Sequence, residues 1–291
     1  KHRLLDSYEQ LWKNTCNGVW DPAESLIEVS FFAPTVTGSA SEDPCGRIGK
    51  WNGVAVSEIE GKRASNSANV KVIHPFYLRW KEKEPNDLRR DLSIANYKYA
   101  PNKILYVKES PSAGQKNKQI YTPAKWDTEK YVEQHNSLLN KDKSNINWYI
   151  LRYADVLLLY AEALNECHNG PTSDALAAIN MVRRRGYGKP YLTGNSAIDL
   201  KTMSYEDFKK AVQNERAYEL AFEGQRRQDL VRWGIYYESI VNTYKDIVGW
   251  YPEGNFIAYT FTKKGKHELL PIPQRDLDLM KKFNQNPGWG K

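Results

Sequence analysis

At 291 residues, the chain is long enough to bury a sizeable core without a disulfide framework or a metal. Its formal net charge of +7 comes from Lys and Arg spread along the sequence without an extended basic run, which argues against nucleic acid as a partner. No apolar run approaches the ~20 residues of a membrane-spanning helix.

The opening HRLLDSYEQLWKN predicts a helix, because four apolar residues fall on one helical face: Leu4, Tyr8, Leu11 and Trp12. Since this pattern starts at once, we expect the chain to be a fragment. The stretch LIEVSFFA, from Leu26 to Ala33, predicts a buried strand. Gly, Ser, Asn and Pro dominate from Pro34 to about Pro85, which predicts a long loop that carries function or disorder.

Alternating apolar and polar residues within 92–107 predict two short strands with a turn near Pro101 and Asn102. The strongest helical periodicity follows in NWYILRYADVLLLYAEALNE, which predicts an amphipathic helix over 149–166. Small alanines there, and in the helix predicted over 173–185, indicate a close antiparallel pair. Such a pair has the length of a tetratricopeptide repeat, about 34 residues.

One stretch, NERAYELAFEGQRRQDLVRWG, alternates acids with bases from residue 214 onward. In the helix predicted from Ser204, Glu215 lies on an apolar stripe, so we expect it to be partly buried beside an arginine. The candidate partners are Arg152, Arg226 and Arg227. In the alternative hypothesis Glu215 and Asp229 are the acid and base of a glycosidase. We favour the ion-pair network, because the local surplus of arginine would hold both carboxylates ionised.

Four motifs occur in the order found in a known family: LRYADVLLLYAEALNE, AAINMVRRRG, NERAYELAFEGQRRQDLVRWG and HELLPIPQRDLDLMKKFNQNPGW. Together with LIEVSF and NDLRRDLSIANY upstream, they resemble the C-terminal half of the SusD/RagB family. The resemblance implies a mainly α fold, a SusD-like tetratricopeptide-type helical scaffold with long loops and a few short strands. It also implies a single SusD/RagB C-terminal domain over 1–291, without the N-terminal repeat half, signal peptide and lipid anchor.

The same resemblance implies a function. SusD-like proteins bind oligosaccharides or polysaccharides on the extracellular face of the outer membrane and pass them to a SusC-like TonB-dependent transporter. They are lipoproteins and not enzymes. RagB-like peptide capture is the first alternative, and a helical glycoside hydrolase is the least favoured. We expect no cofactor and no metal, because the five histidines are far apart and no HExxH occurs.

The family name does not carry the ligand site over, because that site is built from loops that vary between members. Sugar recognition needs flat aromatic faces and planar hydrogen-bonding groups on loops held by a rigid scaffold. We expect these in three loop segments, at Trp51 with Asn52, at Trp126, and at Trp250 with Tyr251. Trp51 leads, because the glycines around it are expected to leave its ring partly exposed. For each tryptophan, the alternative is a loop anchor packed on the core.

The remaining tryptophans and the cysteines carry weaker expectations. Trp20 and Trp80 are weaker candidates for sugar contact, and four tryptophans are assigned to packing: Trp12, Trp148, Trp233 and Trp289. The three cysteines lack CxxC spacing, so they predict at most a bridge between Cys16 and Cys45.

Overall fold

The computed structural model describes residues 2–31, 46–49, 51–56, 68–101, 103–107, 121–132, 144, 146–280 and 282–290. In these residues helix exceeds strand, and the strands form two-stranded sheets, so the mainly α prediction is confirmed. The chain forms two compact units. Unit 1 is Lys1–Ser110 with Gln119–Glu223, and unit 2 is Pro111–Lys118 with Gly224–Lys291.

Unit 1 begins with α1 (Tyr8–Cys16), which starts where the Ser7 hydroxyl oxygen accepts a hydrogen bond from the Gln10 N–H at 3.2 Å. One face of α1 enters a core cluster rich in aromatic rings, which includes Tyr8, Leu11, Trp12, Trp126, Tyr131, Ile146 and Tyr149. Cys16 is buried, whereas Cys45 lies outside the described residues, as does any bridge to it.

Strand β1 (Ser25–Val29) pairs antiparallel with β6 (Trp148–Arg152), with Glu28 opposite Tyr149. The first strand is therefore shorter than predicted, and Phe32 and Ala33 lie outside the described residues. The helix predicted from residue 149 is wrong over its first four residues, which belong to β6. These residues fit the helical period, but pairing with the distant β1 satisfies their backbone groups instead.

Part of the long loop predicted between Pro34 and Pro85 is in fact a helix, α2 (His74–Lys83). Pro75 suits its first turn, and Tyr77 and Trp80 are buried one turn apart. The helix α3 (Leu88–Ser93) follows, capped by the Asp87 side chain, which accepts a hydrogen bond from the Arg89 N–H at 3.0 Å.

Two further strand pairs surround the next loops. Strand β2 (Ile94–Ala95) pairs with β5 (Thr122–Pro123), and β3 (Tyr97–Ala100) pairs with β4 (Lys103–Tyr106), all antiparallel. The second pair confirms the two strands predicted around residue 101. The short helix α4 (Thr128–Tyr131) comes after β5, and the Asp127 carboxylate caps it by accepting a hydrogen bond from the Lys130 N–H at 3.1 Å.

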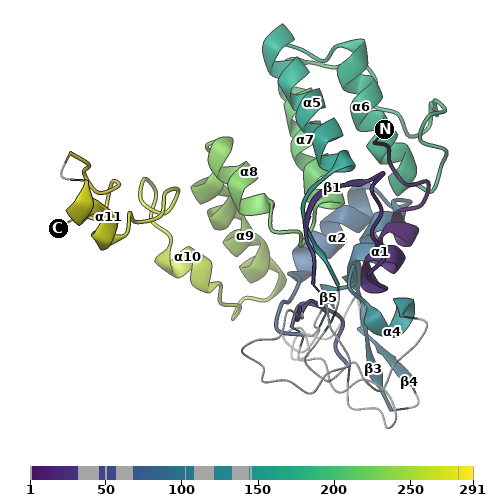
Figure 1. Cartoon of the computed structure of the whole chain (residues 1–291), viewed down its shortest axis with the longest axis horizontal. Coiled ribbons are helices and arrows are strands. Elements are labelled where there is room, and N and C mark those ends of the chain that lie inside the picture. Colours follow the sequence, from purple (N-terminus) through teal and green to yellow (C-terminus); the bar gives the residue numbers. More distant parts are fainter. Residues whose placement is uncertain are drawn as a thin grey trace. The chain divides into compact units, whose positions relative to one another are not determined.

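The predicted helix pair is present as α5 (Tyr153–His168) and α6 (Ser173–Gly186), and α7 (Tyr205–Glu219) packs beside them (Figure 1). Small residues allow this close approach, because the shared core contains Ala154, Leu158, Ala161, Ala175, Ala178, Ile179, Val182, Phe208 and Val212. Helix α7 ends before Phe222, which adopts a positive φ of 69° in the turn after the helix.

Unit 2 contains α8 (Arg226–Arg232), α9 (Tyr236–Trp250), α10 (Ile257–Phe261) and α11 (Gln274–Leu279). Tyr244 of α9 stacks on Tyr259 of α10 with ring centroids 4.1 Å apart. The Trp289 indole N–H is shared between the carbonyl oxygens of Lys266 and Leu269, both at 3.1 Å, so this ring is used in packing as predicted.

Candidate functional site

The acid and base pattern of residues 214–234 belongs, over its first half, to a buried ion-pair network in unit 1. Glu215 is 1% exposed, and its carboxylate lies 2.7 Å from Arg89 Nη1 and 2.8 Å from Arg183 Nη1. The predicted pairing of Glu215 with an arginine is confirmed, but the candidate partners were wrong. Arg89 of α3 and Arg183 of α6 approach from elements that sequence distance does not connect with Glu215, whereas Arg152 takes other carboxylates.

Glu219 is the centre of this network. Its Oε1 lies 2.6 Å from Arg152 Nη1 and 2.5 Å from Arg185 Nη2, and its Oε2 lies 3.0 Å from Arg89 Nη1. Burial acts to raise the pKa of Glu219, but the guanidinium groups of Arg185 and Arg152 outweigh it and hold the pKa far below its usual range. A carboxylate held so firmly as an anion cannot serve as a general acid, which needs a raised pKa.

Lys125 brings a second kind of base into the network. Its ammonium lies 2.6 Å from Glu223 Oε1 and 4.6 Å from the centre of the Trp12 ring, and the side chain is fully buried. Burial lowers the pKa of Lys125 to about 8, although Glu223 opposes this shift. The pKa of Glu223 is itself lowered, because Arg152 and Lys125 outweigh the effect of its burial. These buried groups hold the end of α7 and the turn after it to the core of unit 1.

Trp51, the leading candidate for sugar contact, is 40% exposed in unit 1. Its backbone is tethered, because its carbonyl oxygen accepts hydrogen bonds from the Asn69 and Val70 N–H groups at 2.7 and 3.3 Å. Asn52 Oδ1 accepts from the Gly49 N–H at 2.8 Å, which leaves the Asn52 amide nitrogen as the group to offer a ligand. The loop therefore presents a partly open ring on a fixed backbone.

The glycines near Trp51 act differently from what the sequence analysis expected. Gly49 is buried with φ at +88°, and a Cβ there would lie 3.1 Å from Thr128 Cγ2 and 3.3 Å from Ile146 Cδ1. Gly46 is similarly close to Phe31. These glycines let the loop backbone pack against the core. Their lack of side chains does not account for the exposure of the Trp51 ring.

The other two predicted segments differ from Trp51 in burial. Trp126 is 2% exposed, with its ring 5.9 Å from Trp12 edge-on and stacked 5.4 Å from Trp148, so a sugar has no access to it. This tryptophan is a loop anchor, the alternative given above. Trp250 ends α9 and Tyr251 follows it, both partly buried and both in unit 2.

Trp20 was ranked below Trp51, yet it is the more open ring, at 64% exposed. Its position beside Asp21 gave no sign of this exposure. Trp80, the other weak candidate, is fully buried, stacks on Tyr218 at 4.5 Å and donates its indole N–H to Asp87 Oδ2 at 3.1 Å.

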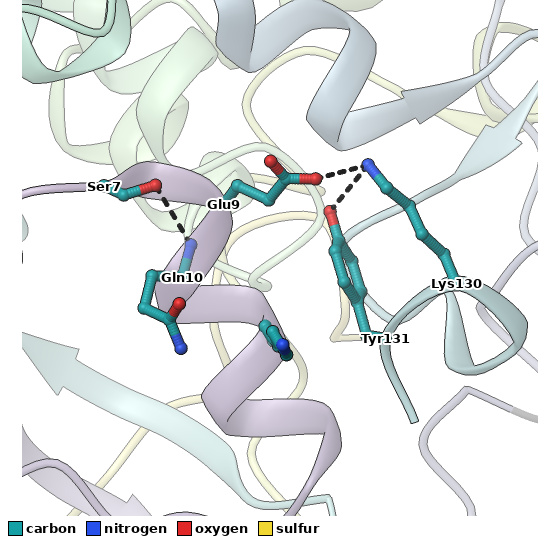
Figure 2. A pocket seen from close by; sticks show the side chains of 6 residues that line it. Ser7, Glu9, Gln10, Lys130 and Tyr131 are labelled. Carbon is teal, nitrogen blue, oxygen red and sulfur yellow. Dashed lines mark hydrogen bonds and ion pairs between the residues drawn. The ribbon is translucent and has the colours of Figure 1, made fainter. Parts of the chain in front are cut away.

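A pocket of about 370 Å³ lies between α1 and α4, lined by Ser7, Glu9, Gln10, Lys13, Lys130 and Tyr131 (Figure 2). Glu9 reaches across from α1, and its Oε1 lies 2.6 Å from Lys130 Nζ. Lys130 Nζ also lies 3.5 Å from the Tyr131 hydroxyl and 4.9 Å from the centre of that ring. The sequence carries no signal for this pocket, because its two walls are far apart in the chain and neither contains a recognisable motif.

In the part of the chain that the structure describes, no three or more His, Cys, Asp or Glu side chains are grouped to hold a metal ion. No helix among these residues has both the length and the apolar character needed to cross a membrane.

Residues 65–289 match the model of the SusD family. The chain belongs to the SusD family. SusD-like protein P25 of Formosa agariphila is 35% identical over 133 residues, which cover 46% of this chain and 22% of that protein. This match confirms the family resemblance of the motifs quoted above.

Solved structures extend the likeness of this SusD-family chain over its whole length. The crystal structure of a SusD homolog from Bacteroides thetaiotaomicron has 56% sequence identity and a TM-score of 0.88, covering 99% of this chain and 56% of that chain. A laminarin-binding SusD-like protein has 25% identity and a TM-score of 0.59, covering 99% and 54%. The chain thus spans about half the length of these solved relatives.

Proposed function

We propose that this chain is part of a surface receptor that captures an oligosaccharide or polysaccharide for uptake without changing it chemically. The observation that carries the proposal is the Trp51 ring, 40% exposed on a loop whose backbone is held by Asn69 and Val70. A flat ring on a fixed loop can receive the C–H face of a sugar without a large ordering cost. Asn52 supports the ring with its amide nitrogen, which can donate to a sugar hydroxyl.

Family membership supports the ligand class. One SusD-like relative of known structure binds laminarin, and it aligns with almost the whole of this chain. The ionic groups around Glu219 support a role without catalysis, because they are buried and saturated by arginine. We propose that the protein works on the extracellular face of the outer membrane as a lipoprotein, with a SusC-like TonB-dependent transporter as its partner.

The test is affinity electrophoresis and isothermal titration of the chain against a polysaccharide panel that includes laminarin, with a peptide mixture in parallel. We expect Trp51→Ala to weaken binding of the best polysaccharide about fivefold, because ring stacking contributes ~1 kcal/mol beyond area burial. Tyr106→Ala is the matched control, since it removes a more exposed aromatic ring, 68% exposed, elsewhere in unit 1. Its binding should equal that of the wild type.

Three results would contradict the proposal. Unchanged affinity of Trp51→Ala would remove Trp51 from the site. Binding of peptides without any glycan would favour RagB-like peptide capture. If chromatography detects shorter sugars released from the polysaccharide, that result would support the glycoside hydrolase alternative.

A further inference from the structure

The pocket between α1 and α4 has a lining made of hydrogen-bonding side chains. Glu9 supplies a carboxylate, Lys13 and Lys130 supply ammonium groups, and the others offer hydroxyl or amide groups. At about 370 Å³ the pocket falls near the lower end of the range for small-ligand sites, ~300–1,000 Å³. A small polar molecule therefore fits it better than an apolar one.

Hydrogen bonds outside the pocket fix the backbone of both its walls, α1 and α4. The Asp127 carboxylate caps α4 with one oxygen, and its other oxygen accepts hydrogen bonds from the Tyr97 and Tyr99 hydroxyls at 2.6 and 2.9 Å. Asn17 Nδ2 donates to the Tyr131 carbonyl oxygen at 2.8 Å and so joins the end of α4 to the end of α1. The lining side chains therefore project from fixed backbone, which lowers the entropy lost on binding.

The charges in the pocket decide the ligand class. Glu9 already neutralises Lys130, so an anion would compete with Glu9 for that ammonium, and a cation would be repelled by the two lysines. A neutral ligand with several hydroxyls meets neither penalty, because a hydroxyl can donate to the Glu9 carboxylate and accept from the Lys130 ammonium. These two groups lie side by side at 2.6 Å, so neighbouring hydroxyls of one molecule can address both (Figure 2). Hydrogen bonds to charged groups are also the stronger kind.

We propose that this pocket binds one neutral sugar residue through its hydroxyl groups, as a subsite separate from Trp51. The Tyr131 ring is buried, with the Lys130 ammonium over it, so it offers no stacking platform. The two sites thus use different chemistry: Trp51 receives the C–H face of a sugar, and the pocket reads hydroxyl positions. The inference rests on the proposed glycan binding, and the experiment below separates the two.

The experiment uses the whole chain and a panel of methyl glycosides: glucoside, galactoside, mannoside and xyloside as neutral probes, with methyl glucuronoside as the acidic probe. Saturation-transfer NMR and isothermal titration measure their affinity. For the best neutral glycoside, we expect Glu9→Gln and Lys130→Met each to weaken binding at least tenfold, because each removes a charge-assisted hydrogen bond. Both side chains are partly exposed, and exposed ion pairs add little stability, so both variants should fold.

The matched control is Glu238→Gln, which breaks an equally short exposed ion pair with Lys264, 2.5 Å long and outside the pocket. It should leave every affinity unchanged, and Trp51→Ala should leave the effect of Glu9→Gln and Lys130→Met on glycoside binding unchanged while it weakens polysaccharide binding. Thermal melts of all variants check that folding is intact.

The possible failures are distinct. The pocket proposal is overturned if no neutral glycoside shows saturable binding, or if Glu9→Gln and Lys130→Met bind the best neutral glycoside like the wild type. In that case, polysaccharide binding that depends on Trp51 would still support the proposed function. If only the glucuronoside binds, and Glu9→Gln strengthens it, the pocket is an anion site and the neutral-sugar proposal is again overturned. If the polysaccharide arm shows no binding either, both proposals fall.

Discussion

Replacing Glu219 by glutamine should destabilise unit 1 strongly, although the side chain keeps its size and shape. The carboxylate accepts from three guanidinium groups, those of Arg152, Arg185 and Arg89, at 2.5 to 3.0 Å. A glutamine has one acceptor oxygen, and its NH₂ group would face an arginine donor. The network also loses its balance of charge, because it contains equal numbers of buried acids and buried bases. The acids are Glu24, Asp87, Glu215, Glu219 and Glu223, and the bases are Arg89, Lys125, Arg152, Arg183 and Arg185.

The magnitude follows from the burial of the stranded charge. Removing one partner from a buried ion pair costs about 3–5 kcal/mol, and among the described residues Arg185 would keep Glu24 as its remaining carboxylate partner. For a unit of this size, such a loss lowers the Tm by roughly 10 °C. Because the pKa of Glu219 is lower in the folded state, its ionic contribution is complete above the unfolded value of about 4.3 and is lost as the pH falls below it.

The assay is guanidinium unfolding at pH 7 and at pH 3, followed by circular dichroism and tryptophan fluorescence. Glu206→Gln is the control, because Glu206 lies exposed on the same helix. We expect the deficit of Glu219→Gln against the wild type to be large at pH 7 and smaller at pH 3. A deficit at pH 7 no larger than that of Glu206→Gln would refute the reasoning.

Three further predictions concern single positions. Gly186→Ala should destabilise unit 1 by a few kcal/mol in a thermal melt, because a Cβ there would lie 2.3 Å from the Nε of the buried Arg89. The control is Gly249→Ala, which has open space around it and should be neutral or stabilising. Equal effects of the two substitutions would contradict the prediction. Lys125 has a pKa of about 8 in the folded state and about 10.4 in the unfolded state, so between these values the unfolded state binds more protons. The free energy of unfolding should therefore rise with pH in this range, by up to about 1.4 kcal/mol per pH unit relative to Lys125→Met. A stability difference between wild type and Lys125→Met that does not change with pH would contradict the lowered pKa. Trp126→Ala should cost about 3–5 kcal/mol of unfolding free energy, as for a core aromatic, and a cost below about 1 kcal/mol would show that the ring is not an anchor.

Local pattern was sufficient for the helices that bury one continuous face. The periodicity of α5 and α6 predicted both helices, because helix formation depends on residues within a few positions of each other. The same logic failed for residues 149–152, which form β6, because strand β1 lies far away in the sequence and pairs with them. It also missed α2, where a proline in the first turn and a short apolar face were hidden among loop-like residues.

The sequence by itself determined the family, the helical scaffold and the burial of Glu215, since each follows from ordered motifs or from spacing along one helix. Only the tertiary structure decided that Arg89 and Arg183 neutralise Glu215, that Trp126 is closed and Trp51 open, and that Glu9 meets Lys130 across a pocket. Ion pairing, ring exposure and pocket shape depend on which distant segments come together. The spacing of residues along a single segment does not show which distant segments will contact it, because many partners of the right charge or size occur in the chain.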